Sequence, residues 1–291
     1  MGYRAGTVKR ERRTKAQIAT LDAQIIAALK VDHPQSVRHV FYLMTNPRLQ
    51  EPVEKSDRGY RHVQERCVYL RRFGKIPYSW IADMSRRGYF VNTFDDAGDF
   101  IRSMSAHYRA NLWADAEYRC EVWTESRSIA SVIQHDCEEL AVSLYPCGGF
   151  SSLSFVHQAA EYSNHYDDGR PLVVLYIGDY DPAGVLIDQS LESELRQHLK
   201  SSIPLIFKRI AINEEQVEIY NLPTKPRKES DKRSQHVKYT VEAEAMPAHL
   251  LRQMLRFEVE ALLPDNALQV AKVAEEDERA HLMRMADMLG G

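Results

Sequence analysis

The sequence predicts a mixed α/β protein, in which a mostly helical N-terminal domain precedes a domain built on a parallel sheet. Apolar residues recur at helical spacing from Lys15 onward. From Arg119 the pattern changes, and short apolar runs alternate with amphipathic stretches. Such alternation of strand and helix is typical of a parallel sheet covered by helices on both faces. A chain of 291 residues is long enough for two modest domains.

The composition is that of an ordinary globular protein. Hydrophobic residues make up 44% and charged residues 27%, and the formal net charge of −3 argues against a uniformly basic nucleic-acid-binding protein. No apolar run approaches the length of a membrane span, and the first residues lack the apolar core of a signal peptide. The four cysteines form no C-x-x-C pair. We therefore expect a cytoplasmic protein with reduced thiols and no membrane partner.

The N-terminal domain is predicted to follow a basic mobile arm, residues 1–14, and to cover residues 15–92. Helical spacing of apolar residues, interrupted by helix-ending residues, predicts four helices, at residues 15–29, 35–44, 58–73 and 78–86. The run Gly-Tyr-Phe-Val at residues 88–91 fits a wing strand. Short helices followed by such a strand are typical of helix-turn-helix and winged-helix modules.

The second half is predicted to contain a helical connector at residues 93–118, the sheet domain at residues 119–263 and a charged C-terminal helix at residues 264–291. Four strands are expected, at residues 120–124, 141–145, 172–177 and 205–212. The helices between them are expected at residues 128–140, 151–163 and 185–200. A basic loop at residues 221–235, a strand at residues 239–245 and a helix at residues 248–262 complete the domain.

The sheet domain is organised around residues 172–187, LVVLYIGDYDPAGVLI. Its six leading apolar residues predict a strand buried on both faces, and Pro182 suits the first turn of the next helix. Asp179 and Asp181 then lie at the carboxyl end of a parallel strand, where open α/β sheets bind ligands. Close carboxylates repel each other unless a cation lies between them, and Mg²⁺ prefers oxygen ligands. The alternative is an aspartate-rich turn that caps the helix.

Glu125 ends the first strand of the domain, so we expect it at the same edge of the sheet. Together with the two aspartates it predicts an acidic site for one or two Mg²⁺ ions. Glu121 is a rival ligand on the same strand, but it lies deeper in the sheet, which favours a structural role. Gly148 and Gly149 follow the second strand, where a tight turn would let backbone N–H groups face a phosphate.

Three segments of the sheet domain together resemble the Toprim domain that topoisomerases, bacterial primases and some nucleases share. They are residues 125–127 (ESR), 145–149 (YPCGG) and 178–184 (GDYDPAG). The D-x-D-P-x-G form, with VEAEAMP at residues 241–247, resembles the topoisomerase VI A subunit, the related meiotic double-strand-break transesterase and the stand-alone Mini-A proteins of mobile elements. The resemblance implies that the three carboxylates are the metal ligands.

The segment VRHVFYLM at residues 37–44 resembles the winged-helix motif R-D-x-[FY]-Y of the same family, whose last tyrosine is the nucleophile. That residue is Tyr42, and Arg38 precedes it by one helical turn on the same face. The chain departs from the pattern at His39, which replaces an acidic residue; it is expected on the helix surface, and contact with a phosphate is the alternative. It departs again at Ser126, which replaces a lysine or glycine. Both departures concern phosphate handling.

The resemblance implies cleavage of double-stranded DNA by transesterification, with a 5′-phosphotyrosine link and a homodimer in which the tyrosine of one subunit faces the metal of the other. A phenol has a pKa near ~10, so Tyr42 requires a cation beside its oxygen, and Arg38 is suited to that role or to holding the phosphate. The chain has no G-x-x-x-x-G-K-[ST] motif. Strand passage would therefore require a separate ATPase subunit of the GHKL type, and the protein would be associated with the nucleoid.

The N-terminal arm and the basic loop are candidates for phosphate contacts, because lysine and arginine outnumber the acidic residues there, whereas the chain as a whole has a negative net charge. The alternative is a solvated tail and loop. The expected DNA-binding side chains lie in the arm and in the basic loop, and are Lys9, Arg10, Arg12, Arg13, Lys225, Arg227 and Lys228.

Two other functions remain open from the residues. In a Toprim nuclease, water would attack the phosphate and Tyr42 would only pack in the core. In a non-catalytic DNA-binding or assembly subunit, the fold would persist without turnover. The tyrosines Tyr60, Tyr69 and Tyr78 are further candidates for the nucleophile, and each is expected to pack or to contact the DNA backbone instead. A primase-like polymerase is less favoured, because primases lack a winged-helix tyrosine before the Toprim domain.

Overall fold

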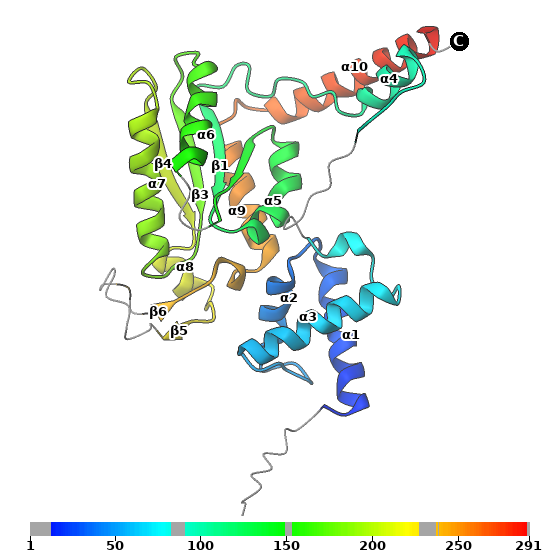
Figure 1. The fold of residues 1–291 in the computed structure, drawn as a ribbon, viewed down its shortest axis with the longest axis vertical. Coiled ribbons are helices and arrows are strands. Elements are labelled where there is room, and N and C mark those ends of the chain that lie inside the picture. Colours follow the sequence, from blue (N-terminus) through cyan, green and yellow to red (C-terminus); the bar gives the residue numbers. More distant parts are fainter. Residues whose placement is uncertain (1–12, 83–90, 149–152, 227–236, 238, 290–291) are drawn as a thin grey trace, which may run out of the picture. The chain divides into compact units, whose positions relative to one another are not determined.

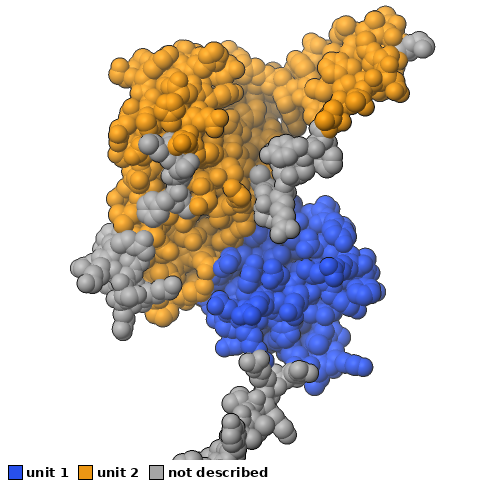
Figure 2. Space-filling view, viewed as in Figure 1, with its two compact units in different colours: residues 1–82 blue, residues 83–291 orange. Residues whose placement is uncertain are grey.

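The computed structural model describes residues 13–82, 91–148, 153–226, 237 and 239–289. The chain divides into two compact units, residues 1–82 and residues 83–291 (Figure 2). The first unit is helical and the second contains a parallel sheet with helices, so the mixed α/β class predicted from the sequence is confirmed. None of the described helices is long and apolar enough to cross a membrane.

The first unit is built from three α-helices and one short 3₁₀ turn among its described residues. They are α1 (Lys15–Val31), α2 (Val37–Met44), α3 (Asp57–Arg72) and η1 (Tyr78–Trp80). Thr14 and Gln17 close the start of α1 reciprocally, since the side chain of each accepts a hydrogen bond from the backbone N–H of the other. The three α-helices meet in a core of Leu21, Ile25, Leu29, Val40, Met44, Val63, Cys67 and Leu70.

The end of the first unit differs from the prediction. Of the helix expected at residues 78–86, residues 78–82 are described; they form only the turn η1, which follows directly on Pro77, and residues 83–86 lie outside the described residues. Of the wing strand expected at residues 88–91, only Val91 is described; it is 90% exposed and belongs to no strand. The winged-helix arrangement therefore stays a prediction.

The second unit contains a four-stranded parallel sheet in the order β2-β1-β3-β4. Its strands are β1 (Arg119–Thr124), β2 (Ser143–Pro146), β3 (Leu172–Ile177) and β4 (Leu205–Ala211). All six residues of β3 are buried, as their unbroken apolar run predicts. Thr124 pairs with Ile177 in register, so β1 and β3 end side by side.

Helices cover both faces of this sheet (Figure 1). The helices α6 (Leu153–His165) and α7 (Gly184–His198) pack on one face, against alternate side chains of β3. The helices α5 (Arg127–Glu139) and α9 (Ala248–Glu260) pack together on the other. The candidate site lies at the carboxyl ends of β1 and β3, where Thr124 and Ile177 are both fully buried.

The connector expected at residues 93–118 is mostly not helical. Only α4 (Ala97–Ser105) forms there, and it packs along the C-terminal helix α10 (Ala267–Leu289) (Figure 1). The Ser105 hydroxyl donates to the Met283 sulfur at 3.3 Å. A helix as short as α4 has little core of its own and needs such a partner.

The strand expected at residues 239–245 is also shorter than predicted. It consists of β6 (Tyr239–Thr240), which pairs with β5 (Lys225–Pro226), and a 3₁₀ turn η2 (Ala243–Ala245) follows. Between the two, Val241 forms an antiparallel bridge to Tyr180. At that bridge the chain has left the small sheet of β5 and β6 and lies beside the loop that follows β3. The short helix α8 (Glu214–Ile219) precedes β5.

Candidate functional site

The candidate site lies at the carboxyl edge of the parallel sheet, as the sequence predicts. Glu125 follows β1, and its backbone N–H donates to the carbonyl oxygen of Ile177 at 2.8 Å. Its side-chain Oε2 accepts a hydrogen bond from the backbone N–H of Asp179 at 2.9 Å. The structure therefore brings Glu125 and the loop of Asp179 and Asp181 together.

Asp179 is the most constrained of these acids. Its Oδ1 accepts a hydrogen bond from the backbone N–H of Ala243 at 2.8 Å. Burial raises the pKa of Asp179 well above its ordinary value, and repulsion by Glu125 and Glu244 raises it further. The pKa of Glu125 is raised for the same reasons, burial first and then the charges of Asp181 and Glu244. Carboxylates in this arrangement favour a bound proton or a cation among them.

Asp181 has a capping role at the start of α7. Its Oδ1 accepts hydrogen bonds from the backbone N–H groups of Ala183 at 2.8 Å and of Gly184 at 2.6 Å. This is the helix-capping turn that the sequence left open as an alternative. Its charge nevertheless contributes to the raised pKa of Glu125, so capping and membership of the acidic group coexist.

Glu244 is a fourth carboxylate at this edge, and the sequence analysis did not assign it a role. It lies in η2 and is only 6% exposed. Its Oε1 accepts hydrogen bonds from the hydroxyl groups of Ser126, at 3.3 Å, and Ser128 at the start of α5. An acidic residue set among the apolar residues of VEAEAM was the available signal. We call Glu125, Asp179, Asp181 and Glu244 the acidic cluster.

Arg209, on β4, fixes the backbone beneath the acidic cluster. Its Nη1 lies 3.1 Å and 3.2 Å from the carbonyl oxygens of Gly178 and Asp179, and its Nη2 lies 2.9 Å from that of Gly184. Its Nε donates to Asp188 Oδ2 at 2.6 Å. One guanidinium therefore ties both ends of the aspartate loop to α7. The sequence gives no signal for Arg209, because an arginine inside a strand carries no motif.

Gly178 permits a close approach of side chains in the site. A β-carbon at this position would lie 2.8 Å from the hydroxyl oxygen of Tyr176 and 2.9 Å from Glu125 Oε2. The Tyr176 ring is fully buried, and its hydroxyl has no hydrogen-bond partner among the described residues. Burial and the charge of Glu125 raise the pKa of this phenol. A buried hydroxyl thus faces the acidic cluster unpaired.

The donor chemistry of the acidic cluster fits Mg²⁺, because carboxylate and hydroxyl oxygens are the ligands this ion takes. In the described part of the chain, however, no three acidic, histidine or cysteine side chains are grouped as ready ligands of one metal ion. Backbone N–H groups and serine hydroxyls occupy several of the carboxylate oxygens instead. Binding a cation would therefore compete with these hydrogen bonds.

Glu121 has the structural role that its depth in the sheet predicts. Its two carboxylate oxygens accept hydrogen bonds from Trp123 Nε1 at 2.9 Å and from the Ser163 hydroxyl at 2.7 Å. Gly148 lies two residues after the end of β2 and has a φ of 71°, a left-handed conformation that suits glycine. Gly149 lies outside the described residues.

Tyr42 and Arg38 belong to the first unit, whereas the acidic cluster belongs to the second. Tyr42 is 7% exposed; its ring lies 5.3 Å from that of Phe41, and Lys55 Nζ lies 5.6 Å from its centroid. The guanidinium of Arg38 lies 4.8 Å from the ring centroid of Tyr60. Tyr42 therefore has a cation near its ring, but little of its side chain reaches solvent.

The expectation that His39 lies on the helix surface is wrong. His39 is 2% exposed, and its Nδ1 lies 2.9 Å from the hydroxyl of Ser36. The reason is the position of α2, which is short and has five buried residues among its eight. A helix covered on more than one side does not keep a polar face for its polar residues.

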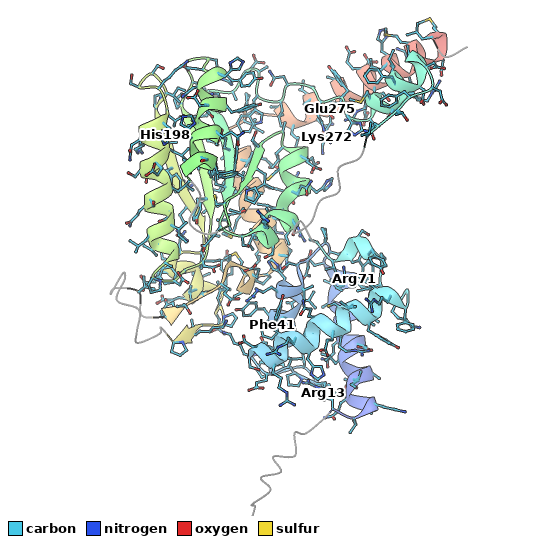
Figure 3. The ribbon with its side chains drawn as sticks, viewed as in Figure 1. Arg13, Phe41, Arg71, His198, Lys272 and Glu275 are labelled. Carbon is cyan, nitrogen blue, oxygen red and sulfur yellow. The ribbon has the colours of Figure 1, made fainter. Side chains whose placement is uncertain are left out.

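The basic residues expected to contact DNA are placed only in part. Arg13 is labelled in Figure 3, and its guanidinium forms contacts within the first unit. It lies 2.7 Å from Glu51, 2.7 Å from His62 Nδ1 and 3.0 Å from the Pro52 carbonyl oxygen. Lys225 Nζ pairs with Glu242 at 2.7 Å. The other five of these residues, Lys9, Arg10, Arg12, Arg227 and Lys228, lie outside the described residues.

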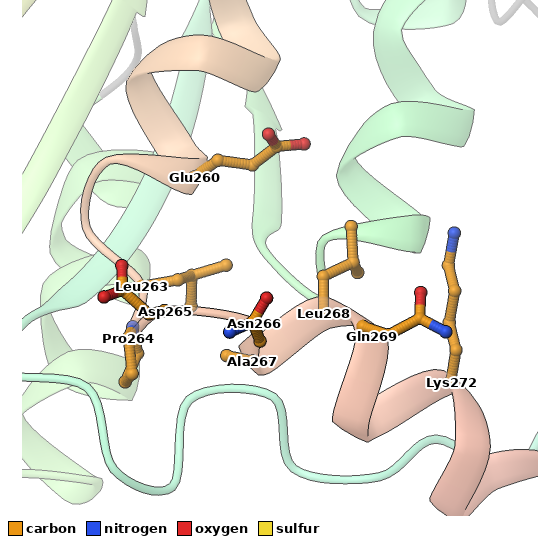
Figure 4. A pocket seen from close by; sticks show the side chains of 9 residues that line it. All are labelled: Glu260, Leu263, Pro264, Asp265, Asn266, Ala267, Leu268, Gln269 and Lys272. Carbon is orange, nitrogen blue, oxygen red and sulfur yellow. The ribbon is translucent and has the colours of Figure 1, made fainter.

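A pocket of about 330 Å³ lies where α9 passes to α10 (Figure 4). None of its lining residues belongs to the acidic cluster. Lys272, one of its lining residues, forms an ion pair with Glu139 at 2.6 Å. This pocket therefore adds no reactive group to the candidate site.

No family model, curated protein or solved structure matches this chain.

Proposed function

We propose that this protein cleaves double-stranded DNA by transesterification to Tyr42, in the manner of the topoisomerase VI A subunit that its motifs resemble. The observation that carries the proposal is the meeting of Glu125 with the aspartate loop at the carboxyl edge of a parallel sheet. The raised pKa of Asp179 and Glu125 supports it, because such carboxylates gain from a cation.

The chemistry follows from the residues proposed to take part. The phenol oxygen of Tyr42 forms a bond to phosphorus, and the bond from phosphorus to the 3′-oxygen breaks. Tyr42 loses its proton to solvent and the 3′-oxygen gains one, which leaves a 5′-phosphotyrosine and a free 3′-hydroxyl. Arg38 would hold the phosphate or stabilise the phenolate. The ester conserves the bond energy, so resealing needs no other energy source.

Glu125, Asp179 and Asp181 would hold one or two Mg²⁺ ions, which supply positive charge where the phosphate becomes more negative. The Tyr176 hydroxyl and Glu244 would complete the oxygen-rich surroundings. We further propose a homodimer on duplex DNA, associated with the nucleoid and located in the cytoplasm. A separate ATPase subunit of the GHKL type would be needed for strand passage. Binding through phosphates should weaken steeply with salt.

The test is a search for covalent protein–DNA complexes. Supercoiled plasmid is incubated with the protein and Mg²⁺, then denatured with detergent and digested with protease before electrophoresis. The proposal expects nicked or linear DNA that carries a peptide, and expects Tyr42→Phe to abolish it. Tyr60→Phe, a neighbouring tyrosine in the same unit, is the matched control and should retain it.

A metal-dependent nuclease that uses water is the second candidate, and the burial of Tyr42 favours it. In that case Tyr42→Phe would still cut the plasmid and no peptide would remain on the DNA. Asp179→Asn would abolish cleavage under both proposals. If the wild type and both variants bind the plasmid alike and none of them cuts it, a non-catalytic DNA-binding subunit is favoured.

A further inference from the structure

One surface of the first unit combines exposed aromatic rings with positive charge. It lies at the C-terminal end of α3 and in the turn that follows, where Figure 3 labels Arg71. The stretch at residues 69–78, YLRRFGKIPY, contains no aspartate or glutamate. We call this surface the aromatic–basic patch and define it as Tyr69, Arg71, Arg72, Phe73, Lys75 and Tyr78.

The aromatic side chains of the patch are open to solvent. Tyr69 is 39% exposed, Phe73 64% and Tyr78 65%. The rings of Tyr69 and Phe73 lie 4.5 Å apart, so they form one apolar platform rather than scattered contacts. Large exposed aromatic side chains grouped in this way are typical of binding surfaces.

The backbone holds this platform in a fixed shape. Gly74 ends α3 with φ of 64°, and the N–H of Lys75 donates back to the Leu70 carbonyl at 2.8 Å. This turn brings the following segment beside the helix end, where the Arg71 guanidinium lies 5.6 Å from the ring centroid of Tyr78. The patch is therefore organised before any ligand binds.

The charges of the patch are available to an anion. Arg72 and Lys75 are exposed and can contact an anion, whereas the Nε of Arg71 is buried and is not part of the accessible charge. The last acidic residue of α3 before the patch is Glu65, which precedes Tyr69 by four positions. Asp22, the acid on α1 that contacts α3, is already paired with Arg66 at 2.6 Å.

We infer that the aromatic–basic patch binds single-stranded DNA, with unpaired bases stacked on its rings and the phosphates held by its cations. Proteins that bind single strands combine aromatic rings with a basic surface, because every base has a face on which a ring can stack. Duplex DNA hides those faces, so duplex binding alone gives the exposed rings no role. The inference goes beyond the proposed function and does not depend on it.

The test measures binding of the full-length protein to a fluorescein-labelled oligothymidylate of about 30 nucleotides by fluorescence anisotropy, without Mg²⁺ and at several salt concentrations. The double variant Phe73→Ala, Tyr78→Ala should weaken binding by at least roughly fivefold for each ring removed. Leucine at the same positions keeps an apolar surface but cannot stack, and it should weaken binding as well. Binding of a hairpin duplex should change little.

The chain offers a matched control in the second unit. Tyr162 and Tyr166 on and after α6 are 54% and 57% exposed, with rings 4.7 Å apart, but they adjoin the acidic residues Asp167 and Asp168. Changing both to alanine should leave the affinity unaltered. The charge variant Arg72→Gln, Lys75→Gln should reduce the salt slope by about 1.4, the value for two phosphate contacts on a single strand.

Three outcomes would overturn the inference. The first is equal binding of the oligothymidylate by aromatic variants whose thermal unfolding is like that of the wild type. The second is a loss of affinity in the Tyr162 and Tyr166 variant as large as that in the patch variant. The third is a leucine variant with a changed sedimentation coefficient and an unchanged affinity for the oligonucleotide, which would make the patch a protein–protein contact. Loss of covalent cleavage in Tyr42→Phe has no bearing on these measurements.

Discussion

Burial, and then repulsion by neighbouring carboxylates, make ionisation of Asp179 and Glu125 unfavourable in the folded protein. Their pKa values are raised above those in the unfolded chain, so the folded state binds protons more readily than the unfolded state. The stability this provides is fully present below the ordinary carboxyl pKa of about 4 and is lost as pH rises through the raised values. Each unit of pKa difference corresponds to about 1.4 kcal/mol.

Asp179→Asn should therefore stabilise the protein at neutral and higher pH, and should do so less at acidic pH. The amide oxygen can still accept the hydrogen bond from Ala243, so only the charge is removed. Urea unfolding at a series of pH values measures the effect. Mg²⁺ should raise the stability of the wild type more than that of the variant. A stability difference that did not vary with pH would contradict the raised pKa.

Tyr176→Phe removes a buried hydroxyl that has no hydrogen-bond partner among the described residues. We expect the free energy of unfolding to stay the same or to rise by about 1 kcal/mol, because an unpaired buried polar group is costly. Tyr162→Phe changes an exposed ring and should have no effect. Thermal unfolding of both variants without Mg²⁺ is the measurement. A loss of 2 kcal/mol or more, roughly the cost of a broken buried hydrogen bond, would mean that the hydroxyl is paired.

At the scale of elements, the site depends on how strand ends and loops are joined. Arg209→Met should destabilise the second unit by about 2–4 kcal/mol, since it leaves Asp188 without its cation and removes the guanidinium hydrogen bonds to three backbone carbonyls of the aspartate loop. Chemical denaturation followed by circular dichroism measures this loss.

Lys208→Met is the matched control for that change. Lys208 is the preceding residue on β4, and its ion pair with Glu258 is half exposed. Exposed pairs contribute at most about 1 kcal/mol, so the loss should be small. Equal losses in the two variants would show that Arg209 does not act through the aspartate loop.

The sequence predicts the strand ends well and the loops between them poorly. An unbroken apolar run locates β3 to the residue, and parallel pairing then implies that Glu125 and Asp179 meet. Glu244 could not be assigned in this way, because it reaches the cluster through the bridge between Tyr180 and Val241. Local patterns specify a strand, but a contact between distant loops depends on packing that no local pattern records.

The same limit explains the errors at the helices. His39 lies in a helix too short for its apolar spacing to tell a covered face from an open one. The helix expected across residues 93–118 has suitable spacing, yet only the part that packs on α10 is helical. In both cases the partner helix decides the outcome, and the partner is not visible in a local window.

At the scale of the whole molecule, the division into two units predicts two unfolding steps. The tryptophans report on them separately, because Trp80 lies in the first unit and Trp113 and Trp123 lie in the second. Ile25→Ala and Leu175→Ala each remove a buried side chain, one from each unit. Each should destabilise its own unit by about 2–5 kcal/mol.

Urea unfolding of these variants in a Trp80→Phe background and in the unaltered chain separates the two signals. Ile25→Ala should shift the transition that depends on Trp80 and leave the other in place, and Leu175→Ala should do the reverse. A single transition that both variants shift equally would mean that the units unfold together.

The contact between Asp179 and the backbone of Ala243 joins residues 64 positions apart. During translation, the strands β1 and β3 emerge well before the segment that carries this N–H group and Glu244. A nascent chain can therefore form most of its sheet before the backbone N–H of Ala243 and the side chain of Glu244 are present. The acidic cluster is thus completed only after residue 244 has been synthesised, later than the four strands of the parallel sheet.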